Sequence, residues 1–354
     1  MWPDFESHIP SPLQSAAAIP VQGLAWLGGQ GTRAIAALVF IGVAVPPAGE
    51  LLKPFVTEAI FLLLCISFMR VDIGALRDLL RRPGIVVAAT AWTMLGVPLI
   101  SGAGCLMAGL DTHSPDLFLA LMLQAVASPM MAAPALAAVM GLDSTLTLIT
   151  LVTSTALVPL TAPLFAYAFF GTALTLSPLG LGLKLVAILA GSLLVAGAIR
   201  RSVGGAAIAR HKGPIDGLNI LILFVFVAAV MGNVVGGFWA DPLKTFELTM
   251  LAFAVFFALV GVTALAFRMI GRERALALGL LVSQRNMGLM VAATDGVLPG
   301  TTWLYFALSQ FPIYLSPQLL KPLVMRLSAA KSTPGHSDDG GEQSGGKNSV
   351  SLGS

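Results

Sequence analysis

Four consecutive polar residues, Ser283, Gln284, Arg285 and Asn286, interrupt a long apolar stretch in the C-terminal third of this chain. A guanidinium at the centre of a membrane-spanning segment costs on the order of 2.5–3.5 kcal/mol even on a lenient insertion scale. The charge of Arg285 must therefore be balanced by an acidic side chain, by helix-end carbonyls or by an anionic substrate. We expect Arg285 either to bind substrate or to tether two helices, and its residue type leaves both roles open.

A second interruption lies in the first half of the chain, around Pro129 and Pro134. Proline has no amide N–H and clashes with the preceding helical turn, so two prolines this close together predict a broken helix. At membrane depth, broken backbone and polar side chains are tolerated only where they face protein or a water-filled cavity. The two interruptions together predict a substrate site formed by Ser128, Pro129, Met130, Met131, Pro134, Gln284, Arg285, Asn286 and Gly288. The alternatives are a kinked structural helix and a polar cluster that only holds the helices together.

The composition indicates that these segments lie in a membrane. Of the 354 residues, 56% are hydrophobic and 10% are charged, against roughly 25% charged in ordinary soluble proteins. The mean hydropathy is +0.89. A soluble fold cannot bury this much apolar surface, whereas a lipid bilayer covers it. We predict a multi-pass protein of the inner (plasma) membrane, surrounded by lipid and without a nucleic-acid partner.

Apolar runs separated by short polar or Gly- and Pro-containing pieces predict ten membrane-spanning helices and no strands. They lie near residues 32–47, 54–69, 84–109, 116–141, 144–170, 178–199, 214–237, 246–267, 275–298 and 301–327. The linkers after the second, sixth and eighth spans carry Arg70, Arg77, Arg81, Arg82, Arg200, Arg201, Arg210, Lys212, Arg268, Arg272 and Arg274. The linkers on the other side carry only Lys53 and Lys244. This asymmetry predicts that both termini are cytoplasmic.

The ten spans divide into two sets of five, and because five is odd the second set enters the membrane from the opposite side. The predicted organisation is an N-terminal cytoplasmic segment 1–31, a first repeat 32–170, an inverted second repeat 178–327 and a disordered cytoplasmic tail 328–354. The two interruptions fall in the fourth helix of each repeat. In secondary transporters, such discontinuous helices build the substrate site at the repeat interface. We therefore expect an all-α fold in which helices 4 and 9 cross near the midplane.

Three segments carry a family resemblance: Phe68–Pro83, which ends in Arg-Arg-Pro, Ser128–Pro163, and Gln284–Leu289. In their order and spacing they resemble the bile acid:sodium symporter superfamily of secondary carriers, and the likeness covers roughly residues 50–325. The resemblance implies a ten-helix fold with a panel domain and a core domain. It also implies that the two broken helices cross in the core and that substrate passes by alternating access.

The resemblance further implies sodium sites made by a Ser-Asn pair after the break in helix 4 and by a Glu at the start of the ninth-helix motif. The matching positions hold Pro134-Ala135 and Leu281, and Arg285 stands where the motif has Gln. A guanidinium repels a sodium ion, so we expect no cofactor, no metal site and no sodium coupling of the usual kind. Coupling to sodium or protons stays an open alternative through oxygens of Thr93, Ser154, Thr155 and Glu58.

The sequence therefore favours a secondary active transporter of a small organic solute, preferably an anion, over an enzyme. Intramembrane catalysis needs a nucleophile with a base, paired acids or metal ligands, and no His lies in a predicted span. A membrane sensor or scaffold would normally carry a folded soluble module, which the Gly- and Ser-rich tail does not provide. The identity of the solute and the formation of a homodimer are not determined by the sequence.

Overall fold

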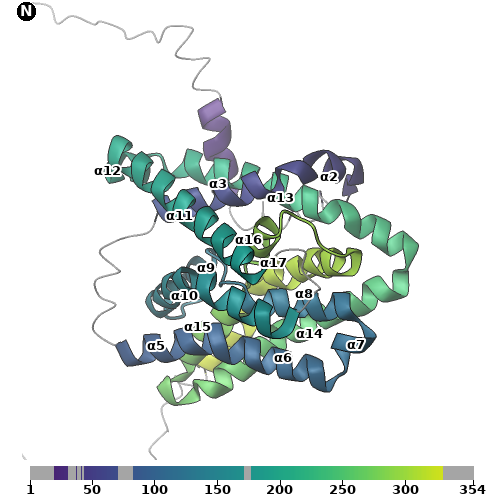
Figure 1. Cartoon of the computed structure of the whole chain (residues 1–354). Helices are drawn as coiled ribbons and strands as arrows, with labels where there is room; N and C mark the ends of the chain where they lie inside the picture. The colour runs from purple at the N-terminus through teal and green to yellow at the C-terminus, as the bar shows by residue number, and fades with distance from the viewer. Residues whose placement is uncertain are drawn as a thin grey trace, which may run out of the picture.

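The computed structural model describes residues 20–30, 37, 41, 44–70, 83–170 and 177–329. Over these ranges the chain is almost entirely helical and contains no strand beyond one isolated pair of bridged residues (Figure 1). Six helical stretches in these ranges are long and apolar enough to cross a membrane: Gly49–Met69, Pro83–Met107, Ser144–Phe169, Pro178–Val203, Lys212–Ala240 and Pro242–Ala266. The predicted class of helical membrane protein is confirmed to this extent.

The surface of these helices suits a lipid environment. Large apolar side chains stand exposed along them, including Val87 at 66%, Leu160 at 70% and Leu194 at 74% of their full accessible surface. Soluble monomers rarely expose contiguous apolar patches of this kind, whereas a bilayer covers them with hydrocarbon. The chain is therefore embedded in a membrane.

Most of the predicted spans have a helical counterpart close to the expected residues. The second predicted span corresponds to α2 (Pro46–Leu52), η1 (Lys53–Phe55) and α3 (Val56–Met69). The third corresponds to α5 (Pro83–Ala91), the π-helical η3 (Trp92–Gly96) and α6 (Val97–Met107). The later continuous helices are α10 (Ser144–Phe165), extended by the π-helical η4 (Ala166–Phe170), α11 (Pro178–Val203), α13 (Lys212–Ala240), α14 (Pro242–Ala266) and α17 (Gly300–Ala329). Short helices α7 (Leu110–His113), α12 (Gly205–Arg210) and η5 (Arg268–Ile270) connect them. Most of the first predicted span (32–47) and nearly all of the predicted tail lie outside the described residues.

The fourth and ninth predicted spans are each divided into two half-helices, as the sequence predicted. The fourth consists of α8 (Pro115–Val126) and α9 (Ala133–Val139), and the ninth of α15 (Arg272–Ser283) and α16 (Met287–Ala293). Residues 127–132 and 284–286 form the two interruptions.

The helices form two groups that face each other. Helices α2, α3, α11 and α13 pack against one another and make what we call the α3–α13 group. Helices α8, α14, α15 and α17, with α9 and α10 beside them, make the α8–α17 group. In Figure 1 the first group occupies the upper part of the molecule, and α5, α6, α14 and α15 occupy the lower part. Apolar side chains from both groups, among them Leu64, Phe226, Leu289 and Phe306, share one buried core.

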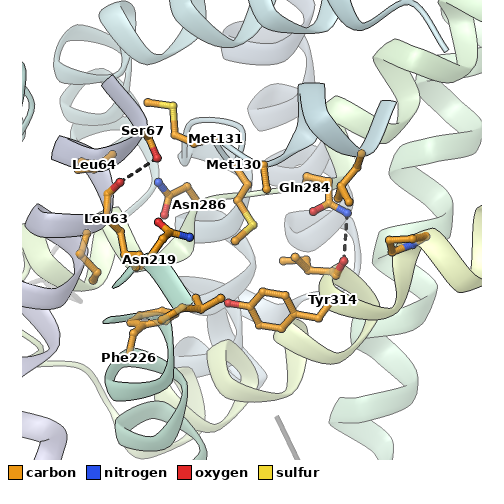
Figure 2. Close-up of a pocket in the computed structure, with 17 residues that line it drawn as sticks. Leu63, Leu64, Ser67, Met130, Met131, Asn219, Phe226, Gln284, Asn286 and Tyr314 are labelled. Carbon is orange, nitrogen blue, oxygen red and sulfur yellow. Dashed lines mark hydrogen bonds between the residues drawn. The ribbon is translucent and has the colours of Figure 1, made fainter. Parts of the chain in front are cut away.

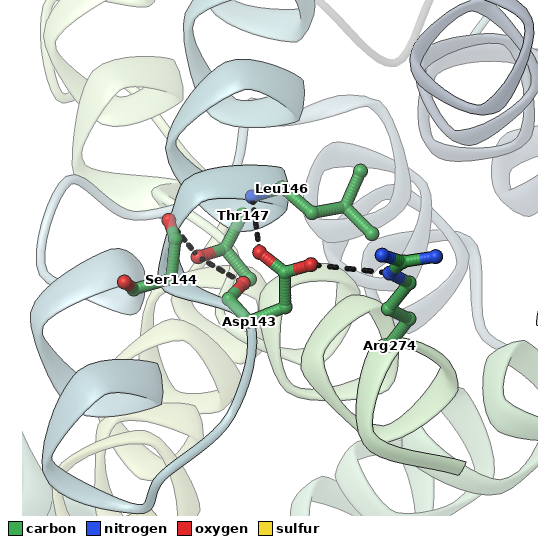
Figure 3. Close-up of polar contacts among 5 residues, drawn as sticks. All are labelled: Asp143, Ser144, Leu146, Thr147 and Arg274. Carbon is green, nitrogen blue, oxygen red and sulfur yellow. Dashed lines mark hydrogen bonds and ion pairs between the residues drawn. The ribbon is translucent and has the colours of Figure 1, made fainter. Parts of the chain in front are cut away.

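One carboxylate, that of Asp143, connects the two interrupted spans on one side of the interruptions. Asp143 ends the turn after α9 and caps α10, its Oδ1 accepting from the N–H of Leu146 at 2.9 Å (Figure 3). Its Oδ2 accepts from Nε of Arg274, in the first turn of α15, at 3.3 Å. An N-cap typically contributes about 1 kcal/mol to helix stability. The same carboxylate thus starts α10 and links the end of α9 to the beginning of α15.

A helical segment over residues 20–30 was not anticipated within the predicted N-terminal segment. It lies directly against the first turns of α13, because glycines on both sides allow backbone contact. A side chain at Gly28 would begin 2.3 Å from the carbonyl oxygen of Gly213, and one at Gly217 would begin 1.9 Å from that of Leu24. Neither position has room for a Cβ atom.

Candidate functional site

The two helix interruptions lie against each other as a short antiparallel pair. The N–H of Asn286 donates to the carbonyl of Ser128 at 2.8 Å, and the N–H of Met130 donates to the carbonyl of Gln284 at 2.6 Å. Pro129 and Arg285 are the residues directly opposite each other in this bridge. In an antiparallel pair the flanking residues make such bonds, so the central position needs no N–H. A proline is therefore tolerated there, and the expected meeting of the two interruptions is confirmed.

The second proline of this region, Pro134, does not break the helix. It lies in the first turn of α9, where its missing N–H is one that a helix leaves unpaired in any case. The predicted break of the fourth span is present, and Pro134 lies at its far edge, at the beginning of α9. The break depends on Pro129 and the extended residues on either side of it.

Arg285 is 1% exposed and binds backbone carbonyls. Its Nη1 donates to the carbonyl of Ala127 at 2.8 Å, and its Nη2 donates to the carbonyl of Thr93 at 3.3 Å. Ala127 follows the last residue of α8 and has extended backbone, so its carbonyl lies outside the helical ladder. Within the described part of the chain, Arg285 makes no ion pair. Of the two roles that the sequence left open, this geometry corresponds to the tether.

The carbonyl of Thr93 is free to accept because of a local change in helix register. In η3 the N–H of Val97, which would serve Thr93 in an α-helix, donates instead to the carbonyl of Trp92. In the π register the carbonyl of Thr93 would accept from the N–H of residue 98, but residue 98 is a proline and has no N–H. The guanidinium of Arg285 supplies the missing donor.

A proline also creates the acceptor that orients Gln284. Pro317 lies inside α17 and cannot donate to the carbonyl of Ile313, one turn earlier. Nε2 of Gln284 donates to this carbonyl at 3.2 Å and to Oγ of Ser316 at 2.6 Å. Both donor hydrogens of the amide are used in this way, while Oε1 has no hydrogen-bond partner. These two bonds therefore hold the acceptor oxygen Oε1 of Gln284 in a fixed position at the edge of the crossing.

A cavity of about 160 Å³ lies beside the crossing, between the two helix groups (Figure 2). Its polar lining groups are Ser67, Asn219, Gln284, Asn286 and Tyr314. Its apolar lining groups include Ile60, Leu63 and Phe226 from the α3–α13 group and Met130, Met131 and Ile313 from the other side. No residue of this lining carries a charge at neutral pH.

Asn286 and Gly288 shape the cavity wall at the start of α16. Oδ1 of Asn286 caps this helix by accepting from the N–H of Leu289 at 3.2 Å. Figure 2 shows the side chains of Asn286 and Asn219 projecting into the same region of the cavity. A methyl group at Gly288 would lie 3.2 Å from Cζ of Phe226 and 3.3 Å from Cδ1 of Ile60. Glycine therefore lets α16 approach the α3–α13 group closely.

The structure divides the predicted substrate residues into two sets. Met130, Met131, Gln284, Asn286 and Gly288 line the cavity, whereas Ser128, Pro129, Pro134 and Arg285 do not. Sequence reasoning missed Asn219 and Tyr314. Asn219 is one of two side-chain amides in the predicted span 214–237, which was a usable signal, and the position of Tyr314 between Pro312 and Pro317 was a weaker one.

The residues proposed for ion coupling lie outside the lining of the cavity. Oγ1 of Thr93 donates to the carbonyl of Ala89 at 2.7 Å, and the buried hydroxyls of Ser154 and Thr155 have no hydrogen-bond partner. None of these three residues lines the cavity, and Glu58 is exposed in the first turn of α3. The described residues contain no group of three His, Cys, Asp or Glu side chains that could hold a metal.

The positions that match the sodium ligands of the resembling family are also unsuitable. Leu281 is completely buried in an apolar cluster with Ala133 and Ile149. Arg285, which lies in the interruption that follows α15, carries a positive charge. These two positions therefore supply no anionic ligand for a sodium ion.

No protein-family model matches the chain, and no curated protein sequence matches it. Its function therefore has to be inferred from the cavity and the crossing themselves.

Proposed function

We propose that the protein is a secondary active transporter of a small organic solute. In this proposal the ten predicted spans form two inverted five-helix repeats, similar to those of the bile acid:sodium symporters, and the cavity beside the crossing is the solute site. The observation that carries the proposal is that two interrupted helices, one from each half of the chain, meet at a cavity between two helix groups. Discontinuous helices at a repeat interface are the usual place for a transporter's binding site.

The lining of the cavity supports an amphipathic solute. Amides of Asn219 and Asn286 and the free Oε1 of Gln284 supply donors and acceptors, while Met130 and Phe226 supply apolar contact. The preference for an anion rested on the half-helix N-termini and on Arg285, and the guanidinium of Arg285 binds two carbonyls away from the lining. We therefore propose recognition by hydrogen bonds and apolar contact, without a charge requirement.

The position of the cavity supports alternating access with the present state open towards the cytoplasm. Ser67 lies near the C-terminal end of α3 and Asn219 near the beginning of α13, where Arg70 and Lys212 mark the predicted cytoplasmic side. At the opposite ends, two contacts join the α3–α13 group to α16 and α17. Lys184 of α11 pairs with Asp295, which follows α16, and the ammonium of Lys53 lies 5.1 Å from the ring centroid of Trp303 in α17. Transport requires these outer contacts to open.

We further propose that transport does not need sodium. A buried guanidinium already supplies a permanent cation to the carbonyls at the crossing, so no bound ion is needed to hold them. Arg285 can thus perform the structural part of an ion's role, while the cavity beside it stays free for the solute.

An intramembrane enzyme is the alternative class, and the cavity supports it less well. A catalytic site of that kind needs a nucleophile within reach of a base, or paired acids. The polar groups lining the cavity are carboxamides and hydroxyls. These groups suit binding and release better than bond cleavage.

The proposal is tested by uptake of radiolabelled amphipathic solutes into proteoliposomes, with taurocholate as the first probe because of the family resemblance. Asn219→Leu removes a lining amide and should lower uptake about fivefold or more, since a missing hydrogen-bond partner costs roughly 1–3 kcal/mol. Gln310→Leu is the control, because Gln310 is a buried amide that donates to its own helix outside the cavity. Equal uptake by Asn219→Leu and the wild type would rule out this cavity as the solute site.

A further inference from the structure

A second cavity, of about 260 Å³, lies between α6, α8 and α14, with η3 beside it. Its lining is mostly apolar, and its polar groups are the side chains of Trp92, Ser101, Gln124 and Thr263. No residue of this lining carries a charge at neutral pH. It shares no lining residue with the cavity beside the crossing, which we call the solute cavity. We call the second cavity the Gln124 cavity.

The amide of Gln124 offers a hydrogen-bond donor to this cavity. The side chain is 3% exposed, and the hydroxyl of Tyr305 in α17 donates to its Oε1 at 2.7 Å. This bond fixes the orientation of the amide. Its Nε2 has no hydrogen-bond partner among the described residues and is open to the cavity. A buried donor without an acceptor is costly, so a bound molecule that brings an acceptor to Nε2 would be stabilised.

The other walls of the Gln124 cavity are held in place by contacts of their own. Nε1 of Trp92 donates to Oγ1 of Thr263 at 3.1 Å, so the indole already uses its only donor. A side chain at Gly96 would begin 2.8 Å from Cε3 of Trp92, which shows that the ring lies directly on the helix backbone. Gly104, which also lines the cavity, has no atom within 4 Å of the position of a Cβ. The cavity therefore has a fixed aromatic wall on one side and free space at Gly104.

The Gln124 cavity opens towards the lipid. Ile100 on α6 and Val262 on α14 line it and are 51% and 45% exposed, on surfaces that the bilayer covers. Gln124 lies close to the middle of the predicted fourth span, 116–141. A phospholipid keeps its phosphate and ester groups outside the hydrocarbon core, so only its acyl chains would reach this depth, and they have no acceptor. A charged molecule would find no counter-charge in the lining.

We propose that the Gln124 cavity binds a neutral membrane lipid with a carbonyl head group, of the isoprenoid quinone class. A ring carbonyl would accept from Nε2 of Gln124, and the planar ring would pack beside the fixed indole of Trp92. The apolar chain would leave the cavity between Ile100 and Val262. The inference depends on the membrane embedding of the chain and on the predicted depth of the fourth span. It does not depend on the proposed transport function, because the two cavities have separate linings.

The test is photolabelling of the full-length protein in proteoliposomes with an azido derivative of decylubiquinone, followed by peptide mass spectrometry. The label should be found on α6, α8 or α14. An excess of decylubiquinone should prevent the labelling, whereas an excess of dodecylbenzene, which has a ring and a chain but no acceptor, should not. Gln124→Met removes the donor and should lower the protected labelling about fivefold or more.

A second variant fills the cavity and leaves the amide in place. Gly104→Leu puts a side chain into the open space and should abolish the protected labelling. The matched control is Gly197→Leu in α11, which also meets no atom within 4 Å and lies outside the lining, so its labelling should equal that of the wild type. If Gln124→Met does not fold, the comparison of Gly104→Leu with Gly197→Leu decides the matter.

Three results would overturn the proposal. Equal protection by dodecylbenzene would describe a site for hydrocarbon chains in general. Wild-type labelling in Gly104→Leu, or in a folded Gln124→Met, would exclude the cavity or its amide. Protected label on α3 or α13 would place the probe in the solute cavity instead.

Discussion

Arg285 reaches from one interrupted helix to the other, with its Nη1 2.8 Å from the carbonyl oxygen of Ala127. The guanidinium and the carbonyl each supply the hydrogen-bonding group that the other lacks. The end of α8 leaves a buried carbonyl without a helical donor, and a buried guanidinium needs acceptors. The π register at Thr93 adds a second carbonyl to the same cation. The broken backbone of the membrane region is therefore stabilised by a side chain of the chain itself.

Substitutions of Arg285 should distinguish a tether from a general positive charge. Arg285→Gln keeps a neutral donor for one carbonyl and should lower the free energy of unfolding by about 1–2 kcal/mol. Arg285→Lys keeps the cost of burying a charge but cannot bridge both carbonyls, so it should be the more destabilising change, by about 3 kcal/mol or more. Thermal unfolding in detergent measures which of the two variants is less stable. Full retention of stability and uptake in Arg285→Lys would contradict the tether.

The orientation of Gln284 should depend on Pro317. In Pro317→Ala, a new N–H can donate to the carbonyl of Ile313 and compete with the amide of Gln284. Gln284→Leu should therefore destabilise the wild type by about 1–2 kcal/mol and the Pro317→Ala background by less. A double-mutant cycle should give a coupling energy of about 1 kcal/mol. Strict additivity of the two changes would show that the freed carbonyl does not orient the side chain.

The close approach of α16 to the α3–α13 group should make Gly288 sensitive to size. Gly288→Ile would place its branched carbon atoms against Phe226 and Ile60, separate the two groups and fill part of the cavity. We expect a loss of about 2 kcal/mol in stability and loss of most uptake. Gly261→Ile is the matched control, because a Cβ at Gly261 meets no atom within 4 Å. Similar losses in both variants would point to backbone conformation instead of contact.

Sodium should have no specific effect on stability. A ligand that binds the folded state raises its stability with concentration, and the proposed transport mechanism uses Arg285 in place of a bound sodium ion. The thermal midpoint should therefore be the same in sodium, potassium and choline chloride of equal ionic strength. A saturable increase seen with sodium alone would contradict the proposed sodium independence.

The interruptions could be predicted from the sequence because each has a local cause. Pro129 removes a helical donor, and the polar run at Gln284 to Asn286 cannot face lipid. The division of the fourth and ninth spans into half-helices, and the contact between the two interruptions, could be predicted from these signals. The helix at residues 20–30 could not be recognised in the same way, since its contact with α13 depends on glycines far apart in the sequence.

The role of Arg285 could not be decided from the sequence, because its acceptors are backbone carbonyls. Every residue carries such a group, and only the register change at Thr93 and the end of α8 make two of them free. The lining residues Asn219 and Tyr314 come from helices outside the two interruptions. Their participation depends on how the helix groups face each other, which local patterns do not specify.

The most direct test of the central claim is the accessibility of the solute cavity from both sides of the membrane. Asn219→Cys, in a background with Cys65 and Cys105 replaced by alanine, is treated with a membrane-impermeant maleimide added to either face of oriented proteoliposomes. A transport site at the crossing should be labelled rapidly from the face that carries Arg70 and Lys212, and more slowly but measurably from the opposite face as the outer contacts open. Labelling from one face only, under all conditions, would describe a static pocket and contradict a transport site at the crossing.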